Sequence, residues 1–384
     1  MIKRIDNTAR LTMLLFSSSA ILLPLSLQTI STELDLNLTQ GGLLGFIPAM
    51  AQFLLLLLSS IYASRIHKVP FLRMAVIIAS TALILFSRVN TFWTAILALI
   101  ILNSGASLLE GLLTPLVEDM HPEDSGKKMN QLHAFWPAGT FLTVIVVGEL
   151  LSRGISWRWP FFVLGLLFLI PAILFPLKTR KLWTPSGANI KQLKSILLHP
   201  VFWLMGMALF FAGGSEGAFA FWTASYIELD FGNLPRAASL GIASFALGMF
   251  IGRINASRLS DRWGLKKILI GTSLAALGIS ATFFLINTLP LLIIFLLFIG
   301  ISLAPLWPSL QSYSARLVPV DSTMMMILLS CFGVPGYSTA TLLMGMVGDQ
   351  WGLKAAFIIA PLYLLLLLAS LSLALFLSKK AQSQ

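Results

Sequence analysis

The stretch GRINASRLSDRWGLKK, Gly252–Lys267, lies between two long apolar runs and carries the strongest indication of the fold. Arg and Lys residues this close to apolar segments are typical of the cytoplasmic face of a membrane protein. Gly264 is expected to allow a tight turn and a close approach that a larger residue would obstruct. Asp261, the acid among these cations, can pair across to a neighbouring helix. The stretch therefore predicts a short basic turn between two membrane-spanning helices.

The composition of the 384-residue chain is that of a polytopic membrane protein. The chain is 57% hydrophobic and only 11% charged, whereas soluble domains are about 25% charged. The formal net charge of +11 does not indicate nucleic-acid binding, because the cations lie in loops between apolar runs. The single cysteine, Cys331, excludes a disulfide within the chain and a cysteine-based metal site.

Apolar runs long enough to cross a membrane recur along the whole chain, since a span needs about 20 mostly apolar residues. The first run, Leu11–Leu27, is longer than the apolar part of a typical signal peptide, and further spans follow at once. We therefore predict that it is a retained helix. The twelve predicted helices cover residues 11–31, 41–64, 70–87, 91–117, 128–152, 157–177, 200–227, 236–258, 266–286, 289–312, 323–347 and 354–378.

The distribution of Lys and Arg predicts the orientation of these helices. With a cytoplasmic N-terminus, five of the 26 Lys and Arg residues fall in external loops: Arg88, Arg153, Arg158, Arg236 and Lys354. This bias predicts cytoplasmic N- and C-termini in an inner (plasma) membrane. The segment 178–199 contains five cations and no acid, and we predict that it is a cytoplasmic linker between six-helix bundles at 1–177 and 200–384.

The two predicted bundles repeat each other in sequence. Residues 63–66, ASRI, match residues 256–259, ASRL, at an offset of 193, and Pro115 matches Pro308 at the same offset. Lys68 stands where Asp261 stands in the second half, so the charge pairing of the two loops cannot be the same. Parallel repeats of this kind are an architecture of secondary transporters.

The Gly-Arg, Arg-x-x-Asp-Arg and Gly-x-Lys spacings of residues 252–267 resemble the signature loop of the major facilitator superfamily, between its eighth and ninth helices. The resemblance implies an all-α fold of twelve helices, with a solute bound between two bundles that rock to give alternating access. The residues expected to form a gating loop are Gly252, Arg253, Arg258, Asp261, Arg262 and Gly264.

Four further segments resemble the fucose–glucose–galactose branch of sugar–proton symporters. They are LEGLLTP (109–115), MNQLHAF (129–135), EGAFAFWTASY (216–226) and APLWP (304–308). The resemblance implies that Glu110 is a proton-linked carboxylate and that Asn130 lies near it. The chain departs from the branch at Ala20, which precedes Ile-Leu-Leu-Pro where the branch can carry an Asp. Glu216 is then a candidate to substitute for the missing acid, unless the protein couples differently or not at all.

Polar residues inside the predicted spans are the candidate functional residues. Glu110 and Glu216 are expected to take part in proton coupling, because an acid in a span is costly unless it faces a cavity or a partner. Either acid could instead stay protonated and bond a neighbouring helix. The candidate solute-binding residues are Gln52, Asn103, Asn130, His133, Trp222, Trp307 and Gln311. The alternatives for these residues are hydrogen bonds between helices for the amides and His133, and plain packing for the tryptophans.

Glycines and prolines are expected to interrupt three helices of the second half. They are Gly213-Gly214 in the seventh helix, Pro305 and Pro308 in the tenth, and Gly333, Pro335 and Gly336 in the eleventh. No phosphate-binding Gly-Lys-Ser/Thr motif and no nucleophile or zinc motif is present in the sequence. We therefore expect a transporter that is not an enzyme, with no metal and no cofactor.

The expected function is secondary transport of a small polar solute, most simply a sugar, coupled to protons. The expected partners are this solute, the proton and membrane lipid, with no nucleic acid, and the protein is expected to be a monomer. One alternative is an exporter of drugs or other amphiphilic compounds in the same fold. Another is a membrane sensor or scaffold that transports nothing, which the acids inside the spans argue against.

Overall fold

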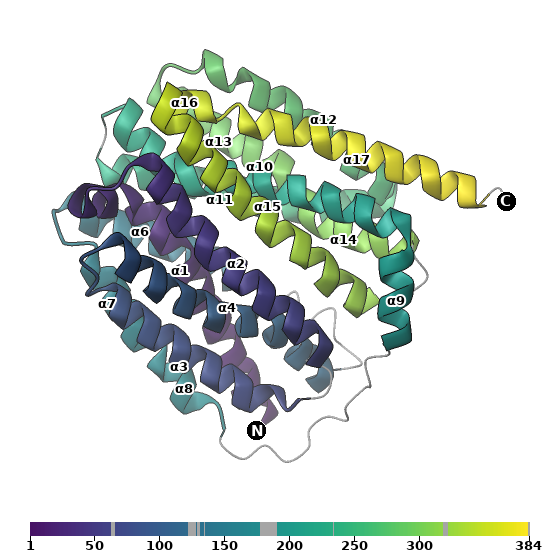
Figure 1. The fold of residues 1–384 in the computed structure, drawn as a ribbon, viewed down its shortest axis with the longest axis horizontal. Coiled ribbons are helices and arrows are strands. Elements are labelled where there is room, and N and C mark those ends of the chain that lie inside the picture. Colours follow the sequence, from purple (N-terminus) through teal and green to yellow (C-terminus); the bar gives the residue numbers. More distant parts are fainter. Residues whose placement is uncertain are drawn as a thin grey trace. The chain divides into compact units, whose positions relative to one another are not determined.

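The computed structural model describes residues 1–62, 66–121, 128, 131–133, 135–176, 190–232, 234–317 and 322–382. Within these ranges the chain consists of helices joined by short turns, and no strand occurs (Figure 1). The helices form two compact units. Unit 1 comprises Met1–Leu36 and Ile47–Ala188, and unit 2 comprises Asn37–Phe46 and Asn189–Gln384. Each unit is described separately below.

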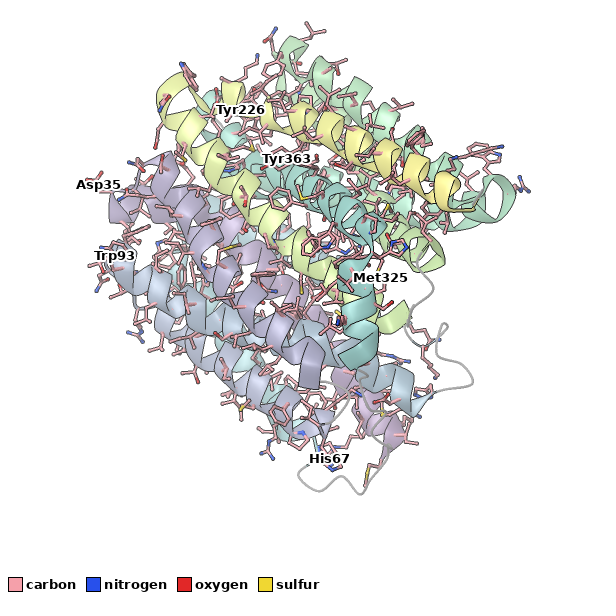
Figure 2. The ribbon with its side chains drawn as sticks, turned by 45° about the vertical axis from the view of Figure 1, so that its right-hand side comes forward. Asp35, His67, Trp93, Tyr226, Met325 and Tyr363 are labelled. Carbon is pink, nitrogen blue, oxygen red and sulfur yellow. The ribbon has the colours of Figure 1, made fainter. Side chains whose placement is uncertain are left out.

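Unit 1 is built from long apolar helices that pack in pairs. Helix α3 packs against α4 and α7, and α1 packs against α6. Asp35 and Trp93 lie at one end of this unit and His67 lies at the other, so the intervening helices run from end to end (Figure 2). The helices are α1 (Ile2–Leu34), α2 (Leu38–Tyr62, which begins in unit 2), α3 (Lys68–Phe86), α4 (Phe92–Met120), α6 (Phe135–Ser152), α7 (Arg158–Leu167) and α8 (Leu169–Leu174).

Unit 2 is organised around α10 (Pro200–Asp230), which packs against α15 (Ser322–Trp351), α17 (Ile359–Gln382) and α11 (Pro235–Trp263) (Figure 1). An aromatic cluster stabilises one end of this unit, where the rings of Phe283 and Phe357 lie 4.3 Å apart and Tyr226 packs on both. The remaining helices are α9 (Ile190–Leu198), α12 (Leu265–Ala281), α13 (Leu289–Leu303), α14 (Leu306–Leu317) and α16 (Leu353–Ala356).

The all-α membrane fold predicted from the sequence is confirmed. Ten helices in the described part of the chain are long and apolar enough to span a membrane, and Arg158–Leu174 forms a shorter apolar segment. The predicted helix 157–177 is divided into α7 and α8, and the predicted helix 354–378 into α16 and α17. Every predicted range contains helical residues among those that the structure describes.

The predicted helix interruptions are wrong in two of three places. Helix α10 continues through Gly213 and Gly214, and α15 continues through Gly333, Pro335 and Gly336. These glycines serve close packing instead, since a Cβ added at Gly213 would lie 2.5 Å from the carbonyl oxygen of Gly333. The interruption at Pro305 is confirmed, because α13 ends at Leu303 and α14 begins at Leu306.

The predicted domain boundaries 1–177, 178–199 and 200–384 differ from the two units in one informative place. Asn37–Phe46, the beginning of α2, belongs with unit 2, although the rest of this helix belongs with unit 1. Within the predicted linker, α9 covers Ile190–Leu198, and residues 177–189 lie outside the described part of the chain. The boundaries themselves stay a prediction.

A network around Arg158 connects three helix ends of unit 1. Its guanidinium group donates to Glu33 Oε1 at 2.7 Å, to the carbonyl oxygen of Val89 at 2.8 Å and to Asn90 Oδ1 at 3.0 Å. The indole of Trp157 donates to the other oxygen of Glu33 at 2.5 Å. The network therefore connects the end of α1, the loop between α3 and α4, and the beginning of α7.

Unit 2 contains the equivalent of this network. Lys354, next to the beginning of α16, donates to the carbonyl oxygen of Ile286 at 3.1 Å and to Asn287 Oδ1 at 2.9 Å. The sequence Ile-Asn-Thr at 286–288 matches Val-Asn-Thr at 89–91, and each pair of acceptors is bound by one cation. This correspondence supports the internal repeat independently of the basic loops.

Replacing Arg158 with Ala is expected to destabilise unit 1 by about 2–4 kcal/mol, because hydrogen bonds to charged groups are each worth about 1.5–3 kcal/mol and several are lost together. The measurement is thermal unfolding of the purified protein. Arg153→Ala is the matched control, because Arg153 is exposed and pairs with Glu149, four residues before it in the chain. Equal melting temperatures for the two variants would contradict the structural role assigned to Arg158.

Candidate functional site

Helix α4 carries a stripe of polar side chains along one side of its membrane-spanning part. Asn103, Ser107, Glu110 and Thr114 are spaced at i, i+4, i+7 and i+11. At about 100° per residue they fall within roughly 60° of one another. By the same geometry, the exposed apolar side chains of Trp93 and Leu97 lie roughly 100° and 140° away from Glu110 around the helix axis.

Glu110 is an exposed residue on this stripe, although it lies well inside the helix. The neighbouring Asn103 donates to the carbonyl oxygen of Leu99 in its own helix at 2.9 Å. Thr114, one turn after Glu110, lies 3.2 Å from Nε2 of His133, measured from its hydroxyl oxygen. His133 is also exposed. Unit 1 therefore contains an accessible carboxyl group on this stripe and an accessible imidazole that contacts Thr114 of the same stripe.

Neighbouring helices contribute further residues of interest in unit 1. Ala20 on α1 is exposed, so a methyl group stands where the resembling branch can carry an Asp. Trp136 on α6 is half-buried and packs edge-on against Phe16 at 5.0 Å between ring centres. Gln52 on α2 is half-buried. Asn130, the remaining candidate of this region, lies outside the described residues.

Glu216 in unit 2 lies among residues from three helices. It is half-buried on α10 and interacts electrostatically with Arg253 on α11 and with Tyr337 on α15. Gly217 leaves room for this arrangement, because a Cβ there would lie 2.9 Å from the ring of Tyr337. A carboxyl group within electrostatic range of a cation is consistent with the expectation that an acid within a span has partners.

The other predicted residues of unit 2 divide into accessible and buried ones. Gln311 is half-buried, and its amide donates to the hydroxyl oxygen of Ser330 at 2.9 Å. Trp307 is half-buried and packs on the backbone at Gly333. Trp222 is fully buried, and its indole donates to the carbonyl oxygen of Thr341 at 3.0 Å. Trp222 therefore packs helices together in this conformation and has no surface for a solute.

The signature loop has one confirmed property and one corrected property. Gly264 adopts a φ of 81°, which residues with a side chain rarely adopt, so the predicted turn is confirmed. The expected close approach at Gly264 is wrong, because an added Cβ would meet no atom within 4 Å. The close approach occurs at Gly252, where a Cβ would overlap the carbonyl oxygen of Ile301.

The charged residues of the signature loop are only partly described. The side chains of Arg253 and Arg262 are exposed, whereas those of Arg258 and Asp261 lie outside the described part of the structure. The gating role of the loop stays a prediction.

Besides the Arg158 network, sequence reasoning missed two charged pairs in unit 1 that involve Lys68 and His121. Lys68 is buried and pairs with Asp119 near the end of α4. His121 Nε2 lies 2.9 Å from both carboxylate oxygens of Asp6 on α1. The first pair could have been inferred from the sequence. A cation at position 68, where the second half has Asp261, requires an acidic partner elsewhere in the same half.

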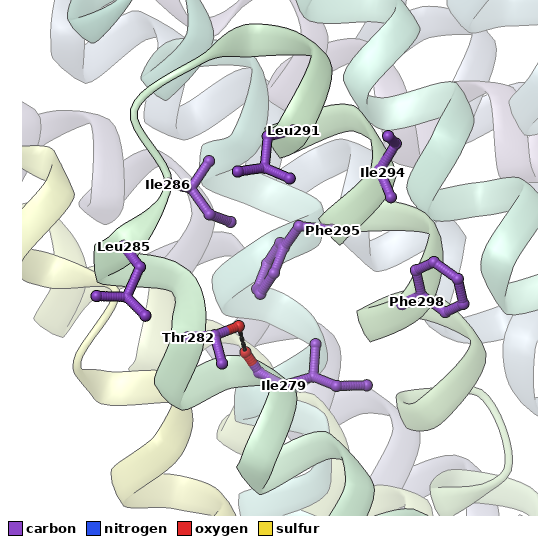
Figure 3. Close-up of a pocket in the computed structure, with 8 residues that line it drawn as sticks. All are labelled: Ile279, Thr282, Leu285, Ile286, Leu291, Ile294, Phe295 and Phe298. Atoms are coloured by element: carbon purple, nitrogen blue, oxygen red, sulfur yellow. Dashed lines mark hydrogen bonds between the residues drawn. The ribbon is translucent and has the colours of Figure 1, made fainter.

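A pocket between α12 and α13 has a volume of about 450 Å³ (Figure 3). Its one polar side chain, Thr282, donates to the carbonyl oxygen of Ile279 at 2.7 Å and offers little to a polar solute. The lining residues are Ile279, Thr282, Leu285, Ile286, Leu291, Ile294, Phe295 and Phe298. This pocket is therefore a poor candidate for the solute site. No group of three or more metal-ligating side chains occurs within the described residues.

Curated bacterial proteins similar to this chain include a transporter. The chain is 23% identical over 284 residues to an uncharacterized MFS-type transporter of Yersinia pestis, covering 73% of this chain and 72% of the relative. It is 21% identical over 291 residues to a TsgA homolog of Buchnera aphidicola, covering 74% and 72%. It is 29% identical over 160 residues to the membrane protein MosC of Rhizobium meliloti, covering 41% and 39%.

Solved structures show the same fold at low sequence identity. A bacterial homolog of the human lysosomal transporter Spinster, in an inward-facing and unoccupied conformation, matches with a TM-score of 0.81 at 16% identity, covering 97% of this chain and 96% of that one. The nucleoside transporter NupG matches with a TM-score of 0.77 at 13% identity, covering 97% and 99%.

The sequence pattern of the Major Facilitator Superfamily matches residues 10–234 and 207–384, which together cover nearly the whole chain. Proteins of this family are membrane transporters and not enzymes. With its all-α fold and internal repeat, the chain belongs to the major facilitator superfamily.

Proposed function

We propose that this protein is a proton-coupled transporter of a small polar solute, most simply a sugar. The observation that carries the proposal is the exposed Glu110 on the polar stripe of α4, away from the apolar residues Trp93 and Leu97. An acid inside a spanning helix is costly unless it faces water or a partner. A carboxyl group in this position is suited to take up and release a proton as its surroundings change.

The proposed coupling follows from the difference in hydration between conformations. An ionised carboxylate is costly in a closed, dry cavity, so ionisation favours the conformation in which water reaches the group. The protonated form is neutral and tolerates the closed conformation. Alternating access would therefore convert a proton gradient into directed solute movement. Glu216, with Arg253 and Tyr337 nearby, is proposed as the second acid of the cycle.

The proposed solute contacts are hydroxyl-binding and ring-packing groups. The amide of Gln311 and the hydroxyl of Ser330 supply a donor and an acceptor, and the face of Trp307 can pack on a sugar ring. The resemblance to sugar–proton symporters supports a hexose. The fold shared with a nucleoside transporter adds nucleosides, which contain a sugar, to the solutes worth testing.

A second candidate is an exporter of amphiphilic compounds, which the small number of polar side chains on the described spans favours. A counterflow assay in proteoliposomes, with labelled hexoses, nucleosides and a lipophilic cation, separates the two functions. Thermal-shift measurements with the same compounds, followed by uptake with and without a pH gradient, test the proposal directly. Exchange of the lipophilic cation alone would overturn it.

The proposed arrangement in the cell is a monomer in the inner (plasma) membrane with both termini cytoplasmic. The excess of Lys and Arg in the loops on one side supports this orientation. A reporter enzyme that is active only outside the cytoplasm, fused after residue 384, tests it. Reporter activity would contradict the proposed orientation.

Replacing Gln311 with Ala is expected to raise the KM for the transported hexose about tenfold, because a lost hydrogen bond to a polar ligand costs about 1–3 kcal/mol. The melting temperature should change little, because Gln311 is only half-buried. Gln350→Ala is the control, because Gln350 is exposed at the end of α15. An unchanged KM would remove Gln311 from the proposed solute site.

A further inference from the structure

The apolar pocket between α12 and α13 opens on the outer side of unit 2. Its floor is Phe295, whose ring packs on Phe283 at 5.5 Å and on Phe219 of α10 at 5.7 Å between ring centres. Because α10 is the central helix of this unit, the pocket opens on the side that faces away from α10. Leu291 and Ile294 on its rim are 48% and 53% exposed, and both belong to a membrane-spanning helix. The acyl chains of membrane lipids therefore reach this pocket.

The pocket has the length and the chemistry to hold part of one acyl chain. Leu291 and Phe298 are seven residues apart on α13, about 10 Å along the helix, which is roughly two-thirds of the hydrocarbon thickness of one leaflet. Thr282, the polar residue of the lining, already donates to the carbonyl oxygen of Ile279, so the lining offers mainly apolar contacts. Figure 3 shows Ile286 and Leu291 toward the end of the pocket that lies next to the turn between the two helices.

Two opposite charges lie beside this end of the pocket. The ammonium group of Lys354 donates to the carbonyl oxygen of Ile286, a lining residue, at 3.1 Å and to Oδ1 of Asn287 at 2.9 Å. An ammonium group has three N–H donors, and the third donor of Lys354 has no hydrogen-bond acceptor among the described residues. Asp230, an exposed residue at the end of α10, is within electrostatic range of Lys354. The apolar pocket therefore ends at a cation that has an acid nearby.

We propose that this pocket binds a phospholipid whose headgroup carries both a phosphate and a primary ammonium group, as in phosphatidylethanolamine. One acyl chain fills the apolar pocket, the phosphate pairs with Lys354, and the ammonium group of the lipid donates to Asp230. Charge-assisted hydrogen bonds of this kind are stronger than neutral ones. An acidic lipid without an ammonium group would instead meet the carboxylate of Asp230. In the proposed topology the site lies in the external leaflet, because the turn between α12 and α13 is external.

Native mass spectrometry of the detergent-purified protein tests the site, because it resolves each bound lipid and gives a dissociation constant for the first one. The first phosphatidylethanolamine is expected to bind about threefold more tightly than phosphatidylcholine or phosphatidylglycerol with the same acyl chains, as for an exposed ion pair. Phosphatidylcholine lacks the N–H donors of the ammonium group, and phosphatidylglycerol lacks the cation.

A tryptophan on the rim tests the acyl-chain part of the site. Ile294→Trp would fill the pocket and should weaken binding of the first phosphatidylethanolamine about tenfold, because each methylene that loses its burial costs about fourfold in affinity. Leu274→Trp is the matched control, because Leu274 is also 53% exposed, lies on α12 and does not line the pocket. The control should bind the lipid as the unmodified protein does.

An asparagine at position 230 tests the headgroup part of the site and leaves the pocket unchanged. Asp230→Asn should reduce the preference for phosphatidylethanolamine over phosphatidylglycerol about three- to tenfold, because the carboxylate no longer attracts the ammonium group or repels the acidic lipid. Asp35→Asn is the matched control, because Asp35 is an exposed acid at the end of α1 with a φ of 52°, which asparagine tolerates. The preference should be unchanged in this control.

A preference for phosphatidylethanolamine that falls in Asp230→Asn, together with weaker binding in Ile294→Trp, supports the proposal. Equal effects of Ile294→Trp and Leu274→Trp would show non-specific surface lipid and would overturn it. Equal binding of the three lipids, or a response in only one of the two variants, would also overturn it. If Ile294→Trp does not fold, as judged by gel filtration, Leu291→Trp on the same rim decides the question. Lipid binding requires no solute and no proton gradient, so this result is independent of the proposed transport function.

Discussion

Glutamine in place of Glu110 should abolish solute-driven proton uptake into proteoliposomes. The amide keeps the size and polarity of the side chain but cannot bind and release a proton. Counterflow of labelled solute should persist, because exchange of solute for solute needs no net deprotonation. The expected result is therefore a transporter that exchanges its solute and no longer accumulates it.

The control for this experiment is Glu149→Gln. Glu149 lies near the end of α6 and pairs with Arg153 at 2.7 Å, away from the polar stripe of α4. This variant should transport protons as the unmodified protein does. Proton uptake that survives unchanged in Glu110→Gln would remove Glu110 from the coupling mechanism and leave Glu216 as the acid to test.

Alanine in place of Gly336 should destabilise unit 2 by about 3 kcal/mol or more, at the upper end of the usual cost of overpacking. The added Cβ would overlap the carbonyl oxygen of Phe210, a backbone atom that cannot rotate away. The variant should therefore separate α10 from α15, or fail to accumulate in the membrane. Thermal unfolding followed by tryptophan fluorescence measures the effect.

Gly271→Ala is the matched control and should change stability in the opposite direction. An added Cβ at Gly271 meets no atom within 4 Å, and this residue lies inside α12. Alanine there should stabilise the helix by about 0.5–1 kcal/mol, because it restricts the unfolded backbone. A melting temperature of Gly336→Ala equal to that of the control would contradict the tight crossing of α10 and α15.

The fold could be predicted because membrane crossing imposes a length on every apolar run. Each predicted range contains helical residues, and the turn at Gly264 followed from the sequence pattern alone. The continuity of α15 through Gly333 and Gly336 could not be predicted, because the effect of a glycine depends on what packs against it. Composition alone does not distinguish a helix break from a close helix crossing.

The candidate site was partly predictable for a similar reason. An acid inside an apolar run is conspicuous, so Glu110 and Glu216 could be selected without coordinates. The burial of Trp222 could not, because an aromatic residue in a span packs equally well on a helix or on a solute.

The matched junctions at Val89-Asn90 and Ile286-Asn287 have a consequence for how each half of the chain is held together. In each half, one cation binds a backbone carbonyl oxygen and the side-chain oxygen of the asparagine that follows it. The first half uses a guanidinium group, which also donates to Glu33, and the second half uses an ammonium group. The basic loops at the other ends of these helices differ more, since Lys68 stands where the second half has Asp261. The contacts that stabilise each half are thus more alike than the two loops.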